Sequence, residues 1–147
     1  MTYQFKLAKV MTIKQDEKNR LLAQYNESVQ YFEQVGQELY DKLKQKEELL
    51  EVQAKKFKSG LVISEIKFFQ QALESVEVTI ANLQRDVMLA RQQMSMRELK
   101  LQEKNIECKK YEKLKDKSYT SYLKTQGDAE SKQMDEISLQ QFMLHRN

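Results

Sequence analysis

Apolar residues recur through the second half of the chain in alternating steps of three and four. Counted from residue 66 to residue 115, this spacing gives fifteen positions, and twelve of them are apolar. We call these positions the seam: Ile66, Phe69, Leu73, Val76, Ile80, Leu83, Val87, Ala90, Met94, Arg97, Leu101, Lys104, Cys108, Tyr111 and Lys115. A heptad pattern of this length is typical of a coiled-coil helix. Because Arg97, Lys104 and Lys115 all fall in its second half, we expect looser or wetter packing there.

The first half of the chain has a rougher version of the same pattern. Its apolar residues are separated mostly by three, four or seven positions: Phe5, Leu7, Val10, Ile13, Leu21, Leu22, Tyr25, Val29, Phe32, Val35, Leu39, Leu43, Leu50 and Phe57. Between the two halves, Gly60 is suited to ending one helix, and Ser59 or Ser64 to capping the next. The pattern therefore predicts an all-α fold, a long antiparallel two-helix coiled coil. We expect helix one over about 4–57, a turn over about 58–63 and helix two over about 64–125.

A reversal near residue 59 or 60 fixes which residues face each other. The numbers of facing residues then sum to about 119, which sets Leu39 near Ile80. The same sum leaves everything beyond about Ser118 without a partner helix. There Gly127 and Asp128 predict a break followed by an N-cap, and then a short helical tail over about 128–144. The whole chain, 1–147, would be a single α-hairpin with this tail.

Composition and charge support long helices and argue against nucleic acid. The 147 residues contain three Gly and no Pro, too few for the turns of a sandwich, barrel or doubly wound sheet. The 25 Lys and Arg residues exceed the 22 Asp and Glu residues by only three, and both signs are interleaved. Nucleic-acid binding usually shows as a one-sided basic stripe, so we expect no nucleic-acid partner.

The sequence also indicates a cytoplasmic location. The longest unbroken apolar run is four residues, Val87 to Ala90, whereas a helix that crosses a bilayer needs about 20. Charged residues interrupt the apolar residues at the amino end, so no signal peptide is expected. Cys108 is the single cysteine, which excludes an internal disulfide and fits a reducing compartment. Association with a membrane would then depend on partner proteins.

We expect no enzyme activity, cofactor or metal. Two packed helices form no water-excluded pocket of the kind that catalysis needs. Cys108 occupies a seam position and is better explained as core filler, whereas His145 has no Asp, Cys or second His at helical spacing. The many carboxylates alternate with lysines, which is typical of solvated helix faces. Three scattered glycines cannot form a phosphate-binding loop.

Two features are candidates for protein binding. Phe68 lies about 100° from Phe69 around the helix, so one helix partner cannot cover both. An uncovered Phe68 would indicate a contact surface near the turn, although local packing is equally compatible with the sequence. The second feature is a basic cluster from both ends of the chain, which the antiparallel geometry brings together, although a solvated helix face is the default interpretation of such lysines. It comprises Lys6, Lys9, Lys14, Lys18, Arg20, Lys109, Lys110, Lys113, Lys115 and Lys117.

Four segments resemble a known family. They are Tyr3-Gln-Phe-Lys-Leu-Ala-Lys-Val10 leading to Lys14, Phe69-Gln-Gln-Ala-Leu73 with Val76-Glu77 and Ile80, Lys110-Tyr-Glu-Lys-Leu-Lys115, and Lys132-Gln-Met-Asp-Glu-Ile137. Their order and spacing over nearly the whole chain resemble the FliJ family of flagellar export proteins. This resemblance implies a coiled coil similar to the central stalk of rotary ATPases. It also implies that the chain ends enter and promote the ring of the export ATPase FliI, and that the rest reaches the export gate protein FlhA and escorts export chaperones.

The resemblance further implies two sets of binding residues. The ATPase end would comprise Lys6, Lys9, Lys110, Lys113, Leu114, Lys117, Met134, Asp135, Glu136 and Ile137. The gate end, near the turn, would comprise Glu38, Phe68, Phe69, Ala72, Val76 and Thr79. The alternative function is a coiled-coil scaffold or export chaperone that dimerises through its seam and does not act on an ATPase.

Overall fold

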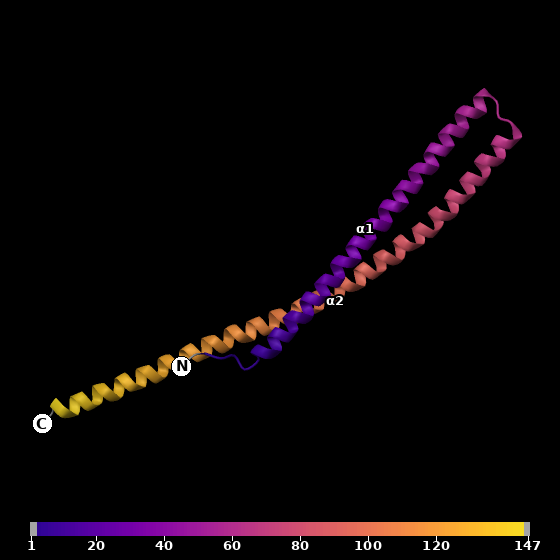
Figure 1. Ribbon diagram of the computed structural model, residues 1–147. Helices are drawn as coiled ribbons and strands as arrows, with labels where there is room; N and C mark the ends of the chain where they lie inside the picture. The colour runs from indigo at the N-terminus through magenta and orange to yellow at the C-terminus, as the bar shows by residue number, and fades with distance from the viewer. Residues whose placement is uncertain (1–2, 146–147) are drawn as a thin grey trace. The chain divides into compact units, whose positions relative to one another are not determined.

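Two long helices joined by a short loop make up residues 3–145, the part of the chain that this computed structural model describes. Helix α1 spans Ala8–Ser59 and helix α2 spans Ile63–His145, and these residues contain no strand (Figure 1). The helices pack against each other, which confirms the all-α hairpin predicted from the seam. Residues 1, 2, 146 and 147 of the predicted domain lie outside the described residues.

The chain divides into two compact units. One, which we call the hairpin unit, is Arg20–Leu101 and contains the loop. The other, the terminal unit, combines Met1–Asn19 with Gln102–Asn147. Each unit contains one segment of α1 and one segment of α2, so each has its own helix–helix contacts.

The loop that reverses the chain is Gly60–Val62, shorter than the expected turn. Gly60 has a φ of 98°, a left-handed conformation that ends α1 and that glycine adopts at little cost. The Val62 carbonyl accepts the first hydrogen bonds of α2, from the backbone N–H groups of Glu65 at 3.0 Å and Ile66 at 3.1 Å. The expected serine cap is wrong. Ser64 lies inside α2, and the Ser59 hydroxyl donates backward to the Lys56 carbonyl of α1 at 3.1 Å.

The helices pair in a register two to four residues away from the expected one. In the hairpin unit, Lys46 pairs with Glu77 at 3.5 Å and Lys56 with Glu65 at 3.7 Å, so the paired numbers sum to 123 and 121 instead of 119. The reason is the later loop: α1 continues to Ser59, which moves the centre of the reversal to about residue 61.

The seam is the core of the fold. All seam positions except Ile66 and Lys115 are buried or half-buried. The most buried side chains of the hairpin unit are Ser28, Val35, Phe69, Val76, Ile80 and Ala90. The one polar member, Ser28, donates its hydroxyl hydrogen to the Tyr25 carbonyl at 2.6 Å, which satisfies it within α1. The core is therefore a single line of side chains between two helices.

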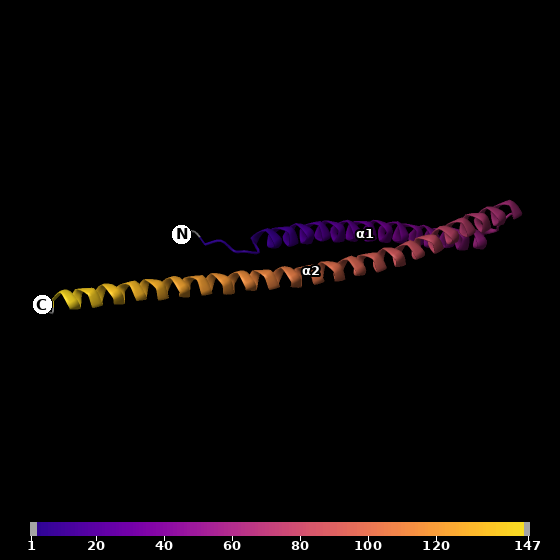
Figure 2. The ribbon, with the colours of Figure 1, turned by 90° about the horizontal axis from the view of Figure 1, so that it is seen from below.

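Helix α2 continues without interruption through Gly127, so the expected break at Gly127 and Asp128 is wrong (Figure 2). Gly127 has no left-handed φ. One glycine in a helix interior costs only about 1 kcal/mol relative to alanine. The flanking residues, including Lys124, Gln126 and Glu130, are good helix formers that keep the helix intact. Within residues 3–145, neither helix has an apolar stretch long enough to cross a membrane.

Candidate functional site

Four charged side chains form a network across the helix pair of the terminal unit. Lys104 of α2 lies 2.8 Å from Glu17 of α1 and 3.1 Å from Glu107 of α2. Lys14 of α1 lies 2.9 Å from Glu107. Beside this network the buried Cys108 thiol donates to the Lys14 carbonyl at 3.4 Å. Lys104 therefore does more than loosen the seam, because it joins the helices through ion pairs.

The network shifts the pKa of each member toward its charged form. The hydrogen bond from Lys104 lowers the pKa of Glu17, and those from Lys14 and then Lys104 lower the pKa of Glu107. In return, the bond to Glu107 raises the pKa of Lys14, and the bonds to Glu17 and Glu107 raise the pKa of Lys104. All four side chains are partly exposed, so salt will weaken these interactions.

Replacing Lys104 with methionine is expected to raise the pKa of Glu17 and Glu107 toward the ordinary value of 4.5. Glu17 loses its main hydrogen-bond donor, and Glu107 loses the second of its two donors. In the parent protein the two lowered pKa values make the terminal unit most stable above pH 4.5 and less stable as the pH falls through them. The raised lysine pKa values also stabilise the unit; this contribution is complete below pH 10.5 and is lost as the pH rises through the raised values. NMR titration of the two carboxyl groups measures the shift. Unchanged midpoints in the variant would contradict the network.

The segment before α1 lies against α2 in the terminal unit. The Tyr3 ring centroid is 5.2 Å from that of Tyr119 and 5.1 Å from that of Tyr122. Aromatic side chains at these distances attract each other beyond simple burial. After Tyr122, every described residue of α2 is exposed, and we call residues 123–145 the α2 extension. This extension is the helical counterpart of the tail expected from the sequence.

Exposed lysines of the terminal unit form a basic face. Lys110, Lys113 and Lys117 follow the spacing of three and seven that places them on one side of α2, and all three are exposed. The buried Cys108 lies about 160° from Lys110 around the helix, so this side faces away from α1. Two further lysines come from the amino end: Lys6 and Lys9 are exposed and line a shallow hollow together with Lys115.

The other residues predicted for this end are also exposed. Leu114 is about half exposed and borders a second hollow with Phe5, Leu7 and Tyr122. Four lie on the α2 extension: Met134, Asp135, Glu136 and Ile137. The structure therefore places all ten predicted residues in the terminal unit, and all ten are exposed.

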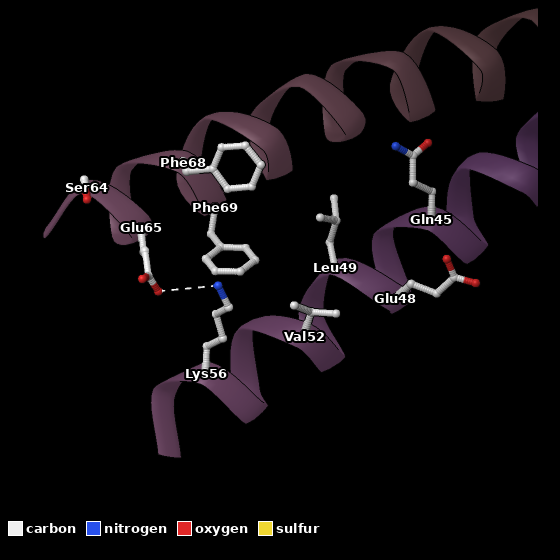
Figure 3. Close-up of a pocket in the computed structure, with 9 residues that line it drawn as sticks. All are labelled: Gln45, Glu48, Leu49, Val52, Lys56, Ser64, Glu65, Phe68 and Phe69. Atoms are coloured by element: carbon white, nitrogen blue, oxygen red, sulfur yellow. Dashed lines mark ion pairs between the residues drawn. The ribbon is translucent and has the colours of Figure 1, made fainter. Parts of the chain in front are cut away.

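The hairpin unit has a groove next to the loop. Phe68 and Phe69 of α2 and Leu49 and Val52 of α1 line it, and the Lys56–Glu65 ion pair lies at one side (Figure 3). Its volume is about 470 Å³. Phe68 is 64% exposed, so it is the uncovered aromatic side chain that would indicate a contact surface.

The residues predicted for the gate end divide by exposure. Glu38 and Phe68 are exposed, and Ala72 and Thr79 are half-buried. Phe69 and Val76 are buried at 3% and 7% exposure, because both belong to the seam and pack between the helices. The first four therefore have accessible surface, whereas Phe69 and Val76 contribute mainly to the core.

The contribution of α1 to this groove is not predicted by the sequence pattern. Leu49, Val52 and Lys56 enter it only because of the register of the two helices. One signal in the sequence points to the Lys56–Glu65 pair. Lys56 is in the last turn of α1 and Glu65 is in the first turn of α2, and each charge interacts favourably with the dipole of its own helix. Among residues 3–145, no group of three His, Cys, Asp or Glu side chains is arranged to hold a metal ion.

Comparison with known proteins shows a full-length similarity. A family model described as flagellar FliJ protein matches residues 3–147. A relative described as a flagellar FliJ protein, from Bacillus subtilis (strain 168), is 39% identical over 144 residues. The alignment covers 98% of this chain and 98% of the relative. No solved structure matches the chain.

Proposed function

The chain belongs to the flagellar FliJ protein family, and we propose that it acts in flagellar protein export as a non-enzymatic coiled coil that promotes the ring of the export ATPase FliI. It would link this ring to the export gate protein FlhA and escort export chaperones. The observation that carries the proposal is the terminal unit, where a helix without a partner helix continues from a basic face.

The terminal unit is the proposed ATPase-binding end. The α2 extension is one helix wide, so it fits an opening that a two-helix segment would not enter. Its exposed Met134 and Ile137 offer apolar contacts, and the basic face of Lys110, Lys113 and Lys117 complements an acidic rim. Lys6 and Lys9 extend the positive charge onto the segment before and at the start of α1.

The hairpin unit is the proposed gate-binding end. Glu38, Phe68, Ala72 and Thr79 would contact FlhA, while Phe69 and Val76 support this surface from the seam beneath it. The protein would act in the cytoplasm and associate with the cytoplasmic face of the cell membrane through these partners.

The test is ATP hydrolysis by FliI with the full chain and with a chain that lacks residues 128–147. We expect the full chain to stimulate hydrolysis and the shortened chain to lose most of the stimulation, because it lacks Met134 to Ile137. Circular dichroism of the shortened chain provides the folding control, since the network of Lys14, Glu17, Lys104 and Glu107 lies outside the deleted part. If neither protein binds FliI or changes its activity, the alternative of a scaffold or export chaperone is favoured.

A further inference from the structure

Helix α2 carries a second row of apolar side chains in the hairpin unit, separate from the seam. We call it the outer stripe: Val78, Met88, Leu89, Met96 and Leu99. Each of these side chains is between 52% and 62% exposed. Solvent-exposed apolar residues are common singly, but several on one side of a helix mark an interaction surface.

The outer stripe lies on the side of α2 opposite the seam. At about 100° per residue, Val78, Leu89 and Met96 fall within about 20° of one another, and Met88 and Leu99 lie about 60° to 80° to one side of Val78, still away from the seam. The buried seam residues Val76 and Ile80 lie about 160° away from this direction. Helix α2 is thus apolar on two opposite faces here, and α1 covers only one of them. A helix that is apolar on both sides is normally packed on both sides.

Helix α1 has no such row in the hairpin unit. Of its exposed apolar residues only Tyr40 lies well away from its seam side, whereas others such as Leu22 and Val52 flank the seam. The surplus apolar surface is therefore specific to α2.

We propose that the outer stripe binds a second copy of this chain through an antiparallel, two-fold symmetric contact. The outer stripe is nearly symmetric about the midpoint between Met88 and Leu89, since only Met96 faces a smaller residue, Ala81. Val78 and Leu99 lie equally far from that midpoint, as do Arg85 and Gln92, the polar residues within the stripe. A two-fold interface uses the same patch on both copies, so it requires a patch that is complementary to itself when reversed.

The charge within the stripe selects the antiparallel direction. In that direction Val78 meets Leu99 of the second copy, and Arg85 meets Gln92, whose amide oxygen accepts hydrogen bonds from a guanidinium group. A parallel pair would instead bring the two Arg85 side chains together, which is unfavourable. The stripe is about 30 Å long. A contact of this size is smaller than standard stable interfaces, so we expect a concentration-dependent dimer with a dissociation constant on the order of 10 µM.

Sedimentation velocity of the full chain over a range of concentrations tests the contact without any partner protein. The parent chain is expected to shift from monomer to dimer, and a Leu89→Glu, Met96→Glu variant to stay monomeric with a dissociation constant raised at least tenfold. The matched control is Leu22→Glu with Tyr40→Glu, which replaces two exposed apolar residues of α1 and should dimerise like the parent chain. A parent chain that is monomeric throughout, or a stripe variant that still dimerises while keeping its helical circular dichroism, overturns the proposal.

Disulfide trapping tests the direction of the pair. In a Cys108→Ala chain, Val78→Cys combined with Leu99→Cys is expected to give a cross-linked dimer under a mild oxidant, whereas Val78→Cys alone should not. The two positions are 21 residues apart on one helix, too far for a bond within one chain. Cross-linking by Val78→Cys alone would indicate a parallel pair and overturn the proposal. Neither experiment involves FliI, so failure here leaves the proposed export function to its own test.

Discussion

The Phe69→Ala variant is expected to lose about 3 to 5 kcal/mol of unfolding free energy, the range for deleting a buried phenylalanine side chain. Phe69 is 3% exposed and points from α2 toward Leu49 and Val52 of α1 (Figure 3). The core is one side chain deep, so no second layer of apolar residues lies behind Phe69 to fill the space. Urea denaturation followed by circular dichroism measures the loss.

Phe68→Ala is the matched control, because it removes the same atoms from the neighbouring position. Phe68 is 64% exposed, and substitutions at such positions usually change stability by about 0.5 kcal/mol or less. The Phe68 substitution should instead weaken binding to FlhA if the groove is the gate-binding surface. Equal losses of stability in the two variants would show that Phe69 is not the anchor of the hairpin unit.

Charge reversal of the basic face is expected to abolish most stimulation of FliI. In the variant Lys110→Glu, Lys113→Glu, Lys117→Glu, a positive side of α2 becomes negative without a change in helix propensity. If an acidic rim attracts this side, three reversed charges should reduce the apparent affinity by on the order of tenfold or more at low salt. Titration of FliI activity with each variant measures the effect.

The control for this variant reverses three exposed lysines of the hairpin unit, Lys44, Lys55 and Lys58. It makes the same change in net charge and should stimulate FliI like the parent chain. Equal loss in both variants would mean that net charge, not the basic face, determines binding. Stimulation by the parent chain should also fall with added salt, because screening weakens exposed charge pairs.

The two-helix fold could be predicted because the seam repeats over six heptads, and a repeat of that length outweighs local exceptions. The register could not, because it depends on where α1 ends. The sequence Lys58-Ser-Gly-Leu-Val-Ile63 is compatible with several turns, and only the left-handed Gly60 and the Val62 carbonyl fix the loop at three residues. The predicted break at Gly127 is wrong because a local cost of about 1 kcal/mol is too small to interrupt a helix whose flanking residues on both sides favour it.

In the candidate site, too, features set by local spacing could be predicted from the sequence, whereas contacts between distant residues could not. The basic face follows from spacing along one helix, so Lys110, Lys113 and Lys117 were identifiable from sequence alone. The role of Lys104 was not, because its partner Glu17 is 87 positions away in the chain. The sequence predicts two incompatible roles for Phe69 and Val76, seam and partner surface, and both side chains are buried in the seam.

The α2 extension has a thermodynamic consequence for any partner that grips it. An isolated helix of about 20 residues is only marginally stable in water, because local hydrogen bonds barely outweigh the entropy of the ordered backbone. Residues 123–145 have no partner helix to add to that balance. Part of the binding free energy of a partner must therefore offset the cost of ordering the extension. The contact can then be specific without a high affinity. Such a helix is suited to repeated engagement and release.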